Sequence, residues 1–179
     1  MKKYFDELTK TMNWLSEKDN TVFIGQAVEY PGTAMFNSLK ETNPQKRLEL
    51  PVFEDTQMGM SLGLALNGFK VISIYPRWNF LLCATNQLVN HVDKFPLIDK
   101  HNKKNNIIIR TAVGSQRPLH PGHQHIGNYT EAYKRMLETV EVLELKEASQ
   151  IMPAYKKAYE RDDGFSTLIV EYMDFYNEK

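Results

Sequence analysis

The sequence has a single cysteine, no excess of charge of either sign and no long apolar run, and each absence excludes a class of protein. Cys83 has no second cysteine to pair with, so an internal disulfide is excluded and a reducing compartment fits. Lysine plus arginine and aspartate plus glutamate both number 22, which argues against nucleic-acid binding, because phosphate recognition normally requires a basic excess. No segment approaches the ~20 consecutive apolar residues that a membrane helix needs.

The amino terminus also lacks the features of a targeting signal. Its first residues, MKKYFDELTK, include acidic side chains where a secretory signal would be apolar. Hydrophobic residues make up 42% of the 179 residues and charged residues 25%, as in ordinary globular proteins. The length suits one domain. The sequence therefore predicts a soluble, cytoplasmic protein.

Apolar runs and helical patterns alternate along the chain. Five helices are predicted, at 2–17, from a cap at Asp55 or Thr56 to a stop at Asn67-Gly68, and at 79–94, 130–140 and 149–161. Six strands are predicted, at 21–25, 48–53, 70–75, 107–113, 141–145 and 165–172. Pro153 is expected in the first turn of its helix, where a missing N–H is tolerated. The near-continuous apolar start of 107–113 is typical of a parallel strand covered on both faces. We therefore expect an α/β fold with a mostly parallel six-stranded sheet flanked by helices on both faces.

The stretch LPVFEDTQMGMSLGLALNG, residues 50–68, combines the end of a strand, a carboxylate and a glycine-containing helix. Glu54 is expected at the turn between strand and helix. Asp55 or Thr56 is expected to cap the helix, because a short side-chain oxygen accepts a hydrogen bond from a free backbone N–H. Gly68 is expected to follow its end, since glycine tolerates a left-handed conformation there.

This stretch resembles the segment P-I-S-E-x-G-x-x-G-x-A-x-G-x-A-x-x-G of the beta subunits of 2-oxo acid dehydrogenases. Those proteins are thiamin diphosphate enzymes, similar in this region to the central domain of transketolases. Glu54 matches a glutamate that binds the aminopyrimidine ring of the cofactor in that family and promotes its imino tautomer. Thr56 stands where the family has glycine. Gly59 and Gly63 share one helix face, which would allow another element or a ligand to approach the backbone closely.

Two further segments resemble the same family. Residues 79–94 are similar to its F-x-x-x-x-D-Q-[IV]-x-N-x-x-x-K helix, and Phe80 matches an aromatic residue that packs on the aminopyrimidine ring. Read without the family, Phe80 is a core residue on a helix stripe. The loop QAVEYPGTAMF resembles G-E-D-V-x-x-Y-G-G-x-F, with Gln26 and Ala27 in place of the acidic pair. Glu29 lies nearby and is either a cofactor contact or a solvated loop carboxylate.

The loop GSQRPLHPGHQHIGNY contains His120, His123 and His125, and three interpretations are open. Imidazoles are zinc ligands, but a fourth ligand with obvious spacing is missing. The histidines could also be incidental to a surface loop. In the third interpretation, residues 122–126 resemble the family's G-x-Q-H-S segment. His125 then matches a histidine near the substrate and the reactive cofactor carbon, where imidazole binds a carboxylate or moves a proton near neutral pH. His123 is a second candidate for the same pocket.

The family's magnesium–diphosphate motif, G-D-G followed downstream by N-N or N, has no match in this sequence. Asp162-Asp163-Gly164 lacks the preceding glycine. We therefore expect residues 1–179 to be a free-standing pyrimidine-binding domain, without the C-terminal transketolase-type domain and without metal ligands of its own. The resemblance implies a diphosphate-binding alpha-type partner that holds Mg²⁺, in a heterotetramer.

Two functions follow from these motifs. One is a subunit of a split thiamin diphosphate enzyme acting on a 2-oxo acid or a ketose by dehydrogenase, decarboxylase, carboligase or transketolase chemistry. The alternative is a non-catalytic binding or regulatory module that retains the fold.

Overall fold

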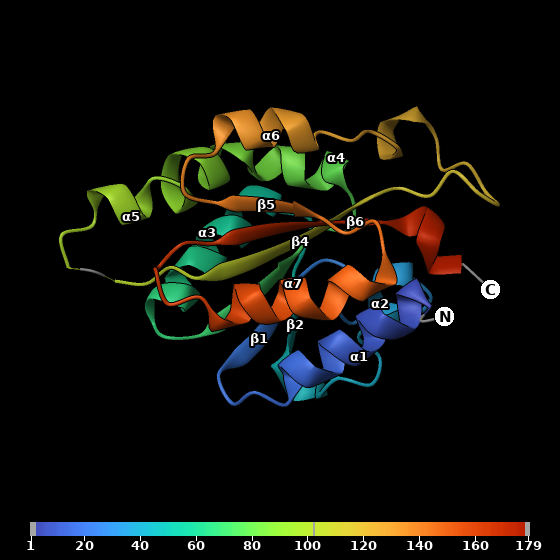
Figure 1. Ribbon diagram of the computed structural model, residues 1–179, viewed down its shortest axis with the longest axis horizontal. Helices are drawn as coiled ribbons and strands as arrows, with labels where there is room; N and C mark the ends of the chain where they lie inside the picture. Colours follow the sequence, from blue (N-terminus) through green and yellow to red (C-terminus); the bar gives the residue numbers. More distant parts are fainter. Residues whose placement is uncertain (1–2, 102, 178–179) are drawn as a thin grey trace.

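The computed structural model describes residues 3–101 and 103–177 of the chain (Figure 1). Within these residues six strands form one sheet in the order β2-β1-β3-β4-β6-β5, and every neighbouring pair is parallel. The strands are β1 (Thr21–Gly25), β2 (Arg47–Glu49), β3 (Lys70–Ile74), β4 (Ile107–Val113), β5 (Glu141–Glu144) and β6 (Thr167–Tyr172). The predicted α/β fold with a parallel six-stranded sheet is confirmed.

Helices cover both faces of the sheet (Figure 1). One face packs against α1 (Tyr4–Ser16), α2 (Ala34–Asn37) and α7 (Ala148–Glu160), and the other against α3 (Glu54–Leu66), α4 (Trp78–Leu81) and α6 (Thr130–Met136). A short helix, α5 (Phe95–Ile98), lies at the end of the molecule where β4 begins. Ile108 belongs to the first core and its neighbours Ile107 and Ile109 to the second, as the alternation of a strand requires.

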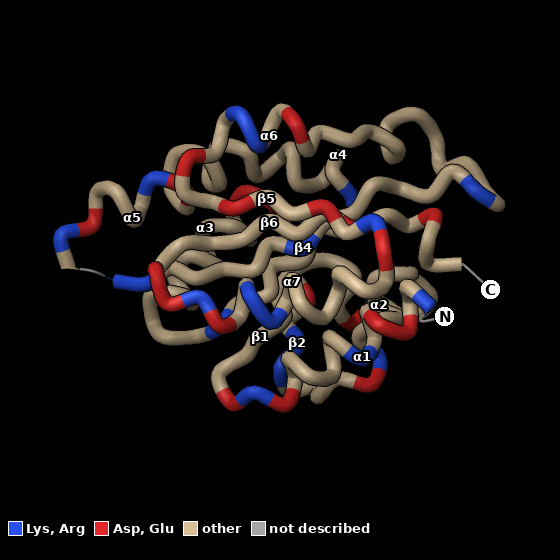
Figure 2. The backbone as a smooth tube through the Cα atoms, viewed as in Figure 1, with Lys and Arg blue, Asp and Glu red and all other residues tan. Residues whose placement is uncertain are grey.

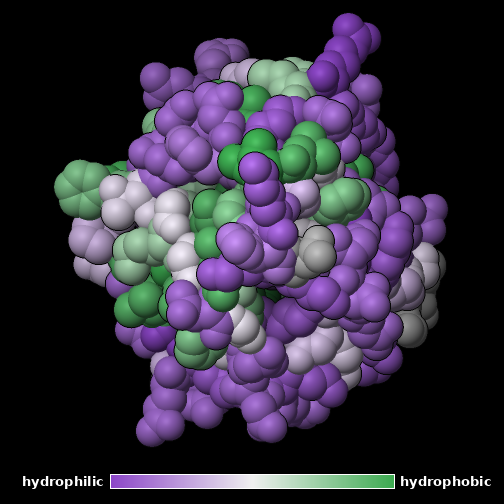
Figure 3. Space-filling model, turned by 90° about the vertical axis from the view of Figure 1, so that its left-hand side faces the viewer, coloured by the Kyte–Doolittle hydropathy of each residue, from purple (hydrophilic) through white to green (hydrophobic). Residues whose placement is uncertain are grey.

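Positively and negatively charged residues are interspersed along the chain (Figure 2). Figure 3 views the end of the molecule with α5, where apolar side chains lie in groups among hydrophilic ones. Leu97 and Ile98 of α5 are among the exposed apolar residues. Across residues 3–101 and 103–177, no helix is both long and apolar enough to cross a membrane.

The junction between β2 and α3 differs from the prediction. β2 ends at Glu49, and Val52 and Phe53 are 68% and 65% exposed instead of contributing to a strand. Pro51 has no N–H with which to continue the ladder, so the chain leaves the sheet there. Helix α3 begins at Glu54 itself, so neither Asp55 nor Thr56 caps it. The predicted end is confirmed, because Gly68 follows the helix with φ +91°.

Three predicted helices also need correction. Residues 79–94 form α4, a 3₁₀ turn (Leu82–Ala84) and a π-helical segment (Gln87–Val92) instead of one continuous helix. Helix α6 stops at Met136, four residues before the predicted end. Pro153 lies in the second turn of α7 and not in the first, because the helix begins at Ala148 behind a capping box.

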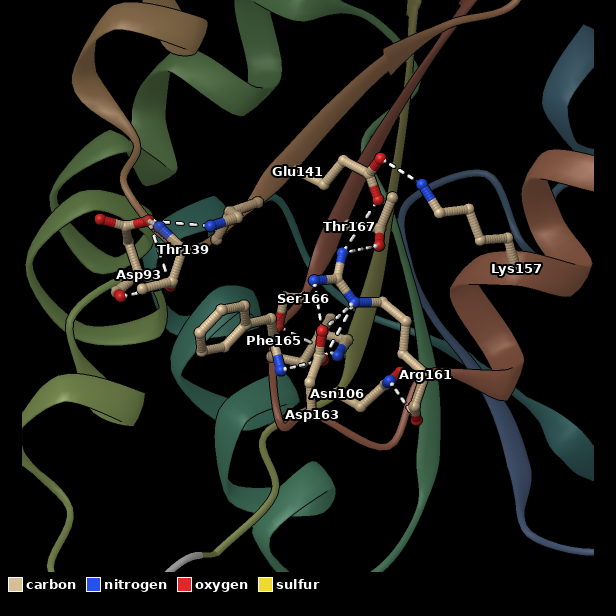
Figure 4. A network of polar contacts seen from close by, with 12 residues as sticks. Asp93, Asn106, Thr139, Glu141, Lys157, Arg161, Asp163, Phe165, Ser166 and Thr167 are labelled. Carbon is tan, nitrogen blue, oxygen red and sulfur yellow. Dashed lines mark hydrogen bonds and ion pairs between the residues drawn. The ribbon is translucent and has the colours of Figure 1, made fainter.

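The π-helical turn of residues 79–94 and the early end of α6 meet at the buried carboxylate of Asp93. Its oxygens accept hydrogen bonds from the backbone N–H groups of Glu138, Thr139 and Val140 at 2.9, 2.8 and 3.0 Å (Figure 4). The π-helical turn ends with the Asp93 N–H donating to the Leu88 carbonyl, which orients Asp93 toward the segment after α6. Residues 138–140 therefore bond to Asp93 and not to the preceding turn of a helix.

A second network of buried polar side chains joins β4 to β6. The Arg110 guanidinium donates to both carboxylate oxygens of Glu171 at 2.8 and 2.9 Å, and both side chains are fully buried. Glu171 also accepts from the hydroxyls of Tyr155, at 2.6 Å, and Tyr176, while Arg110 donates to Ser38 at 2.9 Å. Burial alone would lower the pKa of Arg110, but the Glu171 carboxylate outweighs it and raises that pKa above its ordinary value.

We predict that Asp93→Asn lowers the free energy of unfolding by about 2–3 kcal/mol at pH 7, because an amide cannot accept all of these bonds. Burial raises the pKa of Asp93, but the Thr139 N–H, the Lys94 ammonium and the other backbone donors hold it below its usual value. A carboxyl whose folded pKa is depressed stabilises the fold above its unfolded pKa of about 4 and loses that contribution as the pH falls. The difference between the variants should therefore shrink by pH 3.

Urea denaturation at pH 7 and pH 3 measures this. Asp19→Asn is the control, because Asp19 is exposed and makes no hydrogen bond or ion pair with any described residue. An equal loss of stability at both pH values would contradict the assigned role of the Asp93 charge.

Candidate functional site

The strand order places a crevice at the carboxyl ends of β1 and β3. The chain leaves β1 for β2 on one side and later enters β3 on the other, so the order reverses between these two neighbours. In open parallel sheets, ligands bind outside the carboxyl ends of the strands at such a point. A cavity of about 430 Å³, here called the switch-point cavity, lies there. Its lining residues follow β1, β3 and β6: Ala27, Gly32, Thr33, Ala34, Met35, Pro76, Arg77, Phe80 and Met173.

A larger groove of about 850 Å³ runs between α1, α2 and α7. It is lined by side chains of mixed charge, among them Asp6, Lys10, Glu17 and Lys156, and by Trp14. None of the residues that the sequence predicts for the site lies in it, and it is not at the carboxyl ends of the strands. The switch-point cavity is therefore the better candidate for chemistry, despite its smaller size.

The loop after β1 is held by Glu49 at the end of β2. The Glu49 carboxylate accepts hydrogen bonds from the N–H groups of Ala27, Val28 and Glu29 at 2.9, 2.7 and 2.8 Å. This arrangement places Ala27, which has φ +59°, in the cavity wall. The Glu29 side chain is exposed and makes no hydrogen bond or ion pair with the described residues. Both interpretations of Glu29, as a cofactor contact and as a solvated carboxylate, stay predictions.

Close packing at the end of β1 fixes the start of α3. Gly25 has φ +143°, and a Cβ there would lie 2.2 Å from the Ile74 carbonyl oxygen and 2.6 Å from Gln57 Nε2. Gln57 donates to that carbonyl at 2.9 Å and to Ser73 at 3.2 Å. The first turn of α3 is thereby anchored to β3, which places Glu54 beside the ends of the strands.

Glu54 is buried, with 8% of its surface exposed, yet its carboxylate makes no hydrogen bond or ion pair with any residue in the described part of the chain. The Tyr75 hydroxyl donates to the Glu54 backbone carbonyl at 3.2 Å, so Glu54 lies next to the strand end that leads into Pro76 and Arg77 of the cavity wall. Glu54 itself is not among the lining residues. Neither carboxylate oxygen is among the fully enclosed atoms that lack a partner, so the carboxylate reaches the surface at this edge and is free to accept a donor from another molecule.

The glycine face of α3 is open. Beyond α3's own backbone, the atom nearest to a Cβ built at Gly59 is Gln87 Oε1, at 3.9 Å, and no described atom lies within 4 Å of one built at Gly63. No described element uses the close approach that the two glycines allow, so that approach stays a prediction about another molecule.

Phe80 and His125 are brought together although 45 positions separate them. Phe80 lines the cavity, and its ring centroid lies 6.3 Å from that of His125 at an interplanar angle of 26°. His125 Nδ1 is 3.1 Å from Asn79 Oδ1. With that oxygen as acceptor, Nδ1 carries the proton and Nε2 of the neutral ring is left to accept one. Gly114 supports the arrangement, since a Cβ there would lie 2.1 Å from the His125 carbonyl oxygen.

The other two histidines form a separate pair. The rings of His120 and His123 meet edge to face at 5.4 Å, and His120 Nδ1 accepts a hydrogen bond from the Gly122 N–H at 3.1 Å. His123 does not line the switch-point cavity. In the described residues, no three His, Cys, Asp or Glu side chains are placed to hold a metal ion. The three histidines therefore do not form one ligand set in this conformation.

Sequence reasoning missed Arg77, Asn79 and Glu49. Arg77 lines the cavity, Asn79 orients His125, and Glu49 shapes the loop after β1. Position relative to the ends of parallel strands is the signal that would have found two of them, because ligands bind at the carboxyl edge of such a sheet: Glu49 is the last residue of β2, and Arg77 is the third residue after β3.

The fold of the chain is similar to that of a known protein. No family model matches the sequence. The fold matches that of a solved structure described as "Split gene transketolase, inactive beta4 tetramer", with a TM-score of 0.72 and 19% identity over 95% of this chain and 51% of the other. The chain thus has a transketolase-like fold.

The sequence comparison gives particular relatives. The chain is 26% identical over 180 aligned positions, 98% of its length, to the pyruvate dehydrogenase E1 component subunit beta of Gracilaria tenuistipitata var. liui. It is 27% identical over 123 positions, 66% of its length, to the subunit of the same name from Rickettsia felis. The chain spans 54% of the first relative and 37% of the second. These similarities confirm the predicted resemblance to the pyrimidine-binding domain of thiamin diphosphate enzymes.

We predict that Glu49→Ala leaves the sheet intact but releases the loop after β1, because three N–H groups lose a shared charged acceptor. Bonds to a charged group contribute about 1.5–3 kcal/mol each to local stability, so amide hydrogen exchange at Ala27, Val28 and Glu29 should accelerate at least tenfold. Exchange measured by NMR checks this. Exchange should be unchanged in Glu160→Ala, since the Glu160 side chain is exposed and makes no hydrogen bond or ion pair with described residues. Protection that survives in Glu49→Ala would mean that other contacts hold the loop.

Proposed function

We propose that residues 1–179 form one pyrimidine-binding domain, the half of a thiamin diphosphate-dependent enzyme that activates the cofactor, and that the enzyme acts on a 2-oxo acid or a ketose. The observation that carries the proposal is Glu54, a buried carboxylate at the carboxyl edge of a parallel sheet with no partner among the described residues. The sequence similarity to pyruvate dehydrogenase beta subunits and the transketolase-like fold support it.

The residues present fit an aminopyrimidine ring. Glu54 offers an unpaired carboxylate to a protonated ring nitrogen, and a bond between a charged acceptor and such a donor is short and strong. Phe80 offers the face of a half-buried ring at the cavity wall. Glu29 is a further candidate contact from the loop after β1. Thiamin diphosphate, when bound, supplies the carbon nucleophile that cleaves or forms a bond beside a carbonyl, and the protein positions and polarises it.

His125 is proposed to act on the substrate. Its contact with Phe80 places it beside the proposed ring site, and Asn79 holds one ring nitrogen. The other nitrogen is then available to hydrogen-bond a substrate oxygen or to move a proton near neutral pH. His123, on the same loop, is the second candidate for substrate binding.

The diphosphate and Mg²⁺ are proposed to be held mainly by an alpha-type partner chain, in a heterotetramer. Two observations support a partner. In the described residues no cluster of ligands is placed to hold a metal, and the structural relative is named as the product of a split gene that is inactive as a beta tetramer. Exposed apolar residues also lie near Glu54: Val52 and Phe53 directly before α3, and Met60 within it.

We predict that Glu54→Gln, assembled with the diphosphate-binding partner, exchanges the C2 proton of bound thiamin diphosphate at least a hundredfold more slowly than the unaltered complex. The side chain keeps its shape but loses the charge that favours the protonated ring nitrogen. Proton-exchange NMR on the assembled complex measures the rate. The isolated chain should bind the cofactor poorly.

Asp55→Asn is the matched control, because it removes a neighbouring charge from the same helix terminus. Loss of a favourable charge near a helix N-terminus costs about 0.3–1 kcal/mol and has no chemical consequence. Unchanged exchange in Glu54→Gln, or equal slowing in both variants, would refute the catalytic role and leave a non-catalytic binding module as the better description.

We predict that His125→Ala reduces turnover by about 10²–10⁴-fold, as expected for loss of a proton-transfer group, while the affinity for thiamin diphosphate changes less than twofold. Steady-state kinetics and calorimetric titration of the assembled complex check both values. His120→Ala serves as the control on the same loop. Parallel losses of turnover and cofactor affinity would show that His125 supports the fold of the site instead.

A further inference from the structure

Arg77 is a cation in the wall of the switch-point cavity for which the chain provides no counter-charge. Its side chain is half-buried, its Nε has no hydrogen-bond partner, and it makes no ion pair with any residue in 3–101 or 103–177. Burial is the cause that lowers the pKa of Arg77. A guanidinium stays charged under such conditions and keeps its donors, so it requires an acceptor from outside the chain.

The side chains of the other arginines that are not exposed all make at least one hydrogen bond or ion pair within the chain. Arg110 is paired with Glu171, and Arg161 with Asp163 and Glu141. Arg47, like Arg77, has a buried Nε without a partner and makes no ion pair, but its Nη1 donates to the Leu39 carbonyl at 3.2 Å and its guanidinium lies over the Phe36 ring. Among the half-buried and buried arginines of the described residues, Arg77 is the one whose side chain makes no hydrogen bond, ion pair or ring contact, which separates it from the arginines that stabilise the fold.

The position of Arg77 couples it to the proposed substrate histidine. Its Cδ lies 3.3 Å from where a Cβ of Gly114 would be, and the Gly114 N–H donates to the His125 carbonyl at 3.1 Å. Arg77 and His125 therefore flank the same glycine at the end of β4. An anionic group held by Arg77 would lie on the side of the cavity next to His125 and Phe80.

We propose that Arg77 is a specificity-determining residue that binds a carboxylate or phosphate group of the substrate. This proposal rests on the proposed function, because the anionic group is assigned to the substrate of that enzyme. Apolar walls from Ala34, Met35 and Met173 lower the local dielectric constant, which strengthens an ion pair that forms there. The planar guanidinium binds two oxygens of one anion at once, so Arg77→Lys should retain charge but lose part of the affinity. A neutral substrate would leave a desolvated cation unpaired and bind poorly.

The test follows the Arg77 Nε–H resonance of the full 179-residue chain by ¹⁵N NMR, without cofactor or partner, at constant ionic strength in a buffer free of phosphate. Pyruvate, ribose 5-phosphate and neutral ribose are titrated separately. We expect a saturable shift with millimolar affinity for at least one of the two anions and none for ribose. The anion that binds with the higher affinity shows whether Arg77 prefers a carboxylate or a phosphate group.

Variants assign the binding to Arg77. Arg77→Gln should weaken binding of the preferred anion at least tenfold and Arg77→Lys by less, as monitored by the backbone amides of Gly114 and Phe80. Arg135→Gln should leave it unchanged, because Arg135 is exposed and without a partner in the described chain. Backbone spectra that match the unaltered protein establish that each variant is folded.

No saturable shift with either anion, or equal affinity in Arg77→Gln, would overturn the proposal. Because this titration contains no cofactor, its outcome is independent of proton exchange in Glu54→Gln. An anion site with unaffected proton exchange would reject the proposed enzyme and keep the anion site. Slowed proton exchange in Glu54→Gln without anion binding would keep the proposed enzyme and reject the anion site.

Discussion

The buried ion pair between Arg110 and Glu171 is the interaction on which the carboxyl end of the sheet depends. Removing either partner would leave a charge without compensation in the core, at a cost of about 3–5 kcal/mol, so the pair must form completely or not at all. Two hydrogen bonds join the side chains, and Tyr155 and Tyr176 complete the coordination of the carboxylate. Ser38 joins the network from the segment after α2.

These contacts determine where two walls of the switch-point cavity lie. Met173 follows Glu171 by two positions, and Met35 accepts, through its backbone carbonyl, a hydrogen bond from the Ser38 hydroxyl. The ion pair therefore connects the strand ends β4 and β6 to the loop that closes the cavity.

The charged side chains that stabilise the fold have partners within the chain, whereas two charged side chains at the candidate site do not. Asp93 and Glu49 each collect three backbone N–H groups, and Arg110 is fully paired. Glu54 and Arg77 have no comparable partners among the described residues, and both lie at the carboxyl edge of the sheet. Natural sequences break the rules of local satisfaction mainly where function requires it. The two uncompensated charges of opposite sign therefore point to a ligand that offers both a donor and an anionic group.

Features that depend on interactions between residues close together in the sequence could be predicted, and features that depend on distant residues could not. The strand at 107–113 and the helix end at Gly68 depend on local composition, and both are found where expected. The early end of α6 depends on Asp93 accepting hydrogen bonds from residues 138–140, and Asp93 precedes Glu138 by 45 positions, so no local pattern contains this contact. The same limit applies to the site. Phe80 and His125 were predicted separately from motifs, whereas Arg77 after a proline reads as an ordinary turn until the cavity is seen.

The exposure of α3 gives the incomplete site a physical rationale. Glu54 is 8% exposed, while Val52 and Phe53 immediately before it are 68% and 65% exposed, so the edge beside the buried carboxylate is an apolar surface facing water. In the proposed assembly a partner covers this edge and the open glycine face of the helix. Covering it removes water from around Glu54, and a charge-assisted bond strengthens as the local dielectric constant falls. In that proposed assembly, formation of the interface and polarisation of the cofactor by Glu54 would be one event, which would account for a carboxylate that has no partner among the described residues.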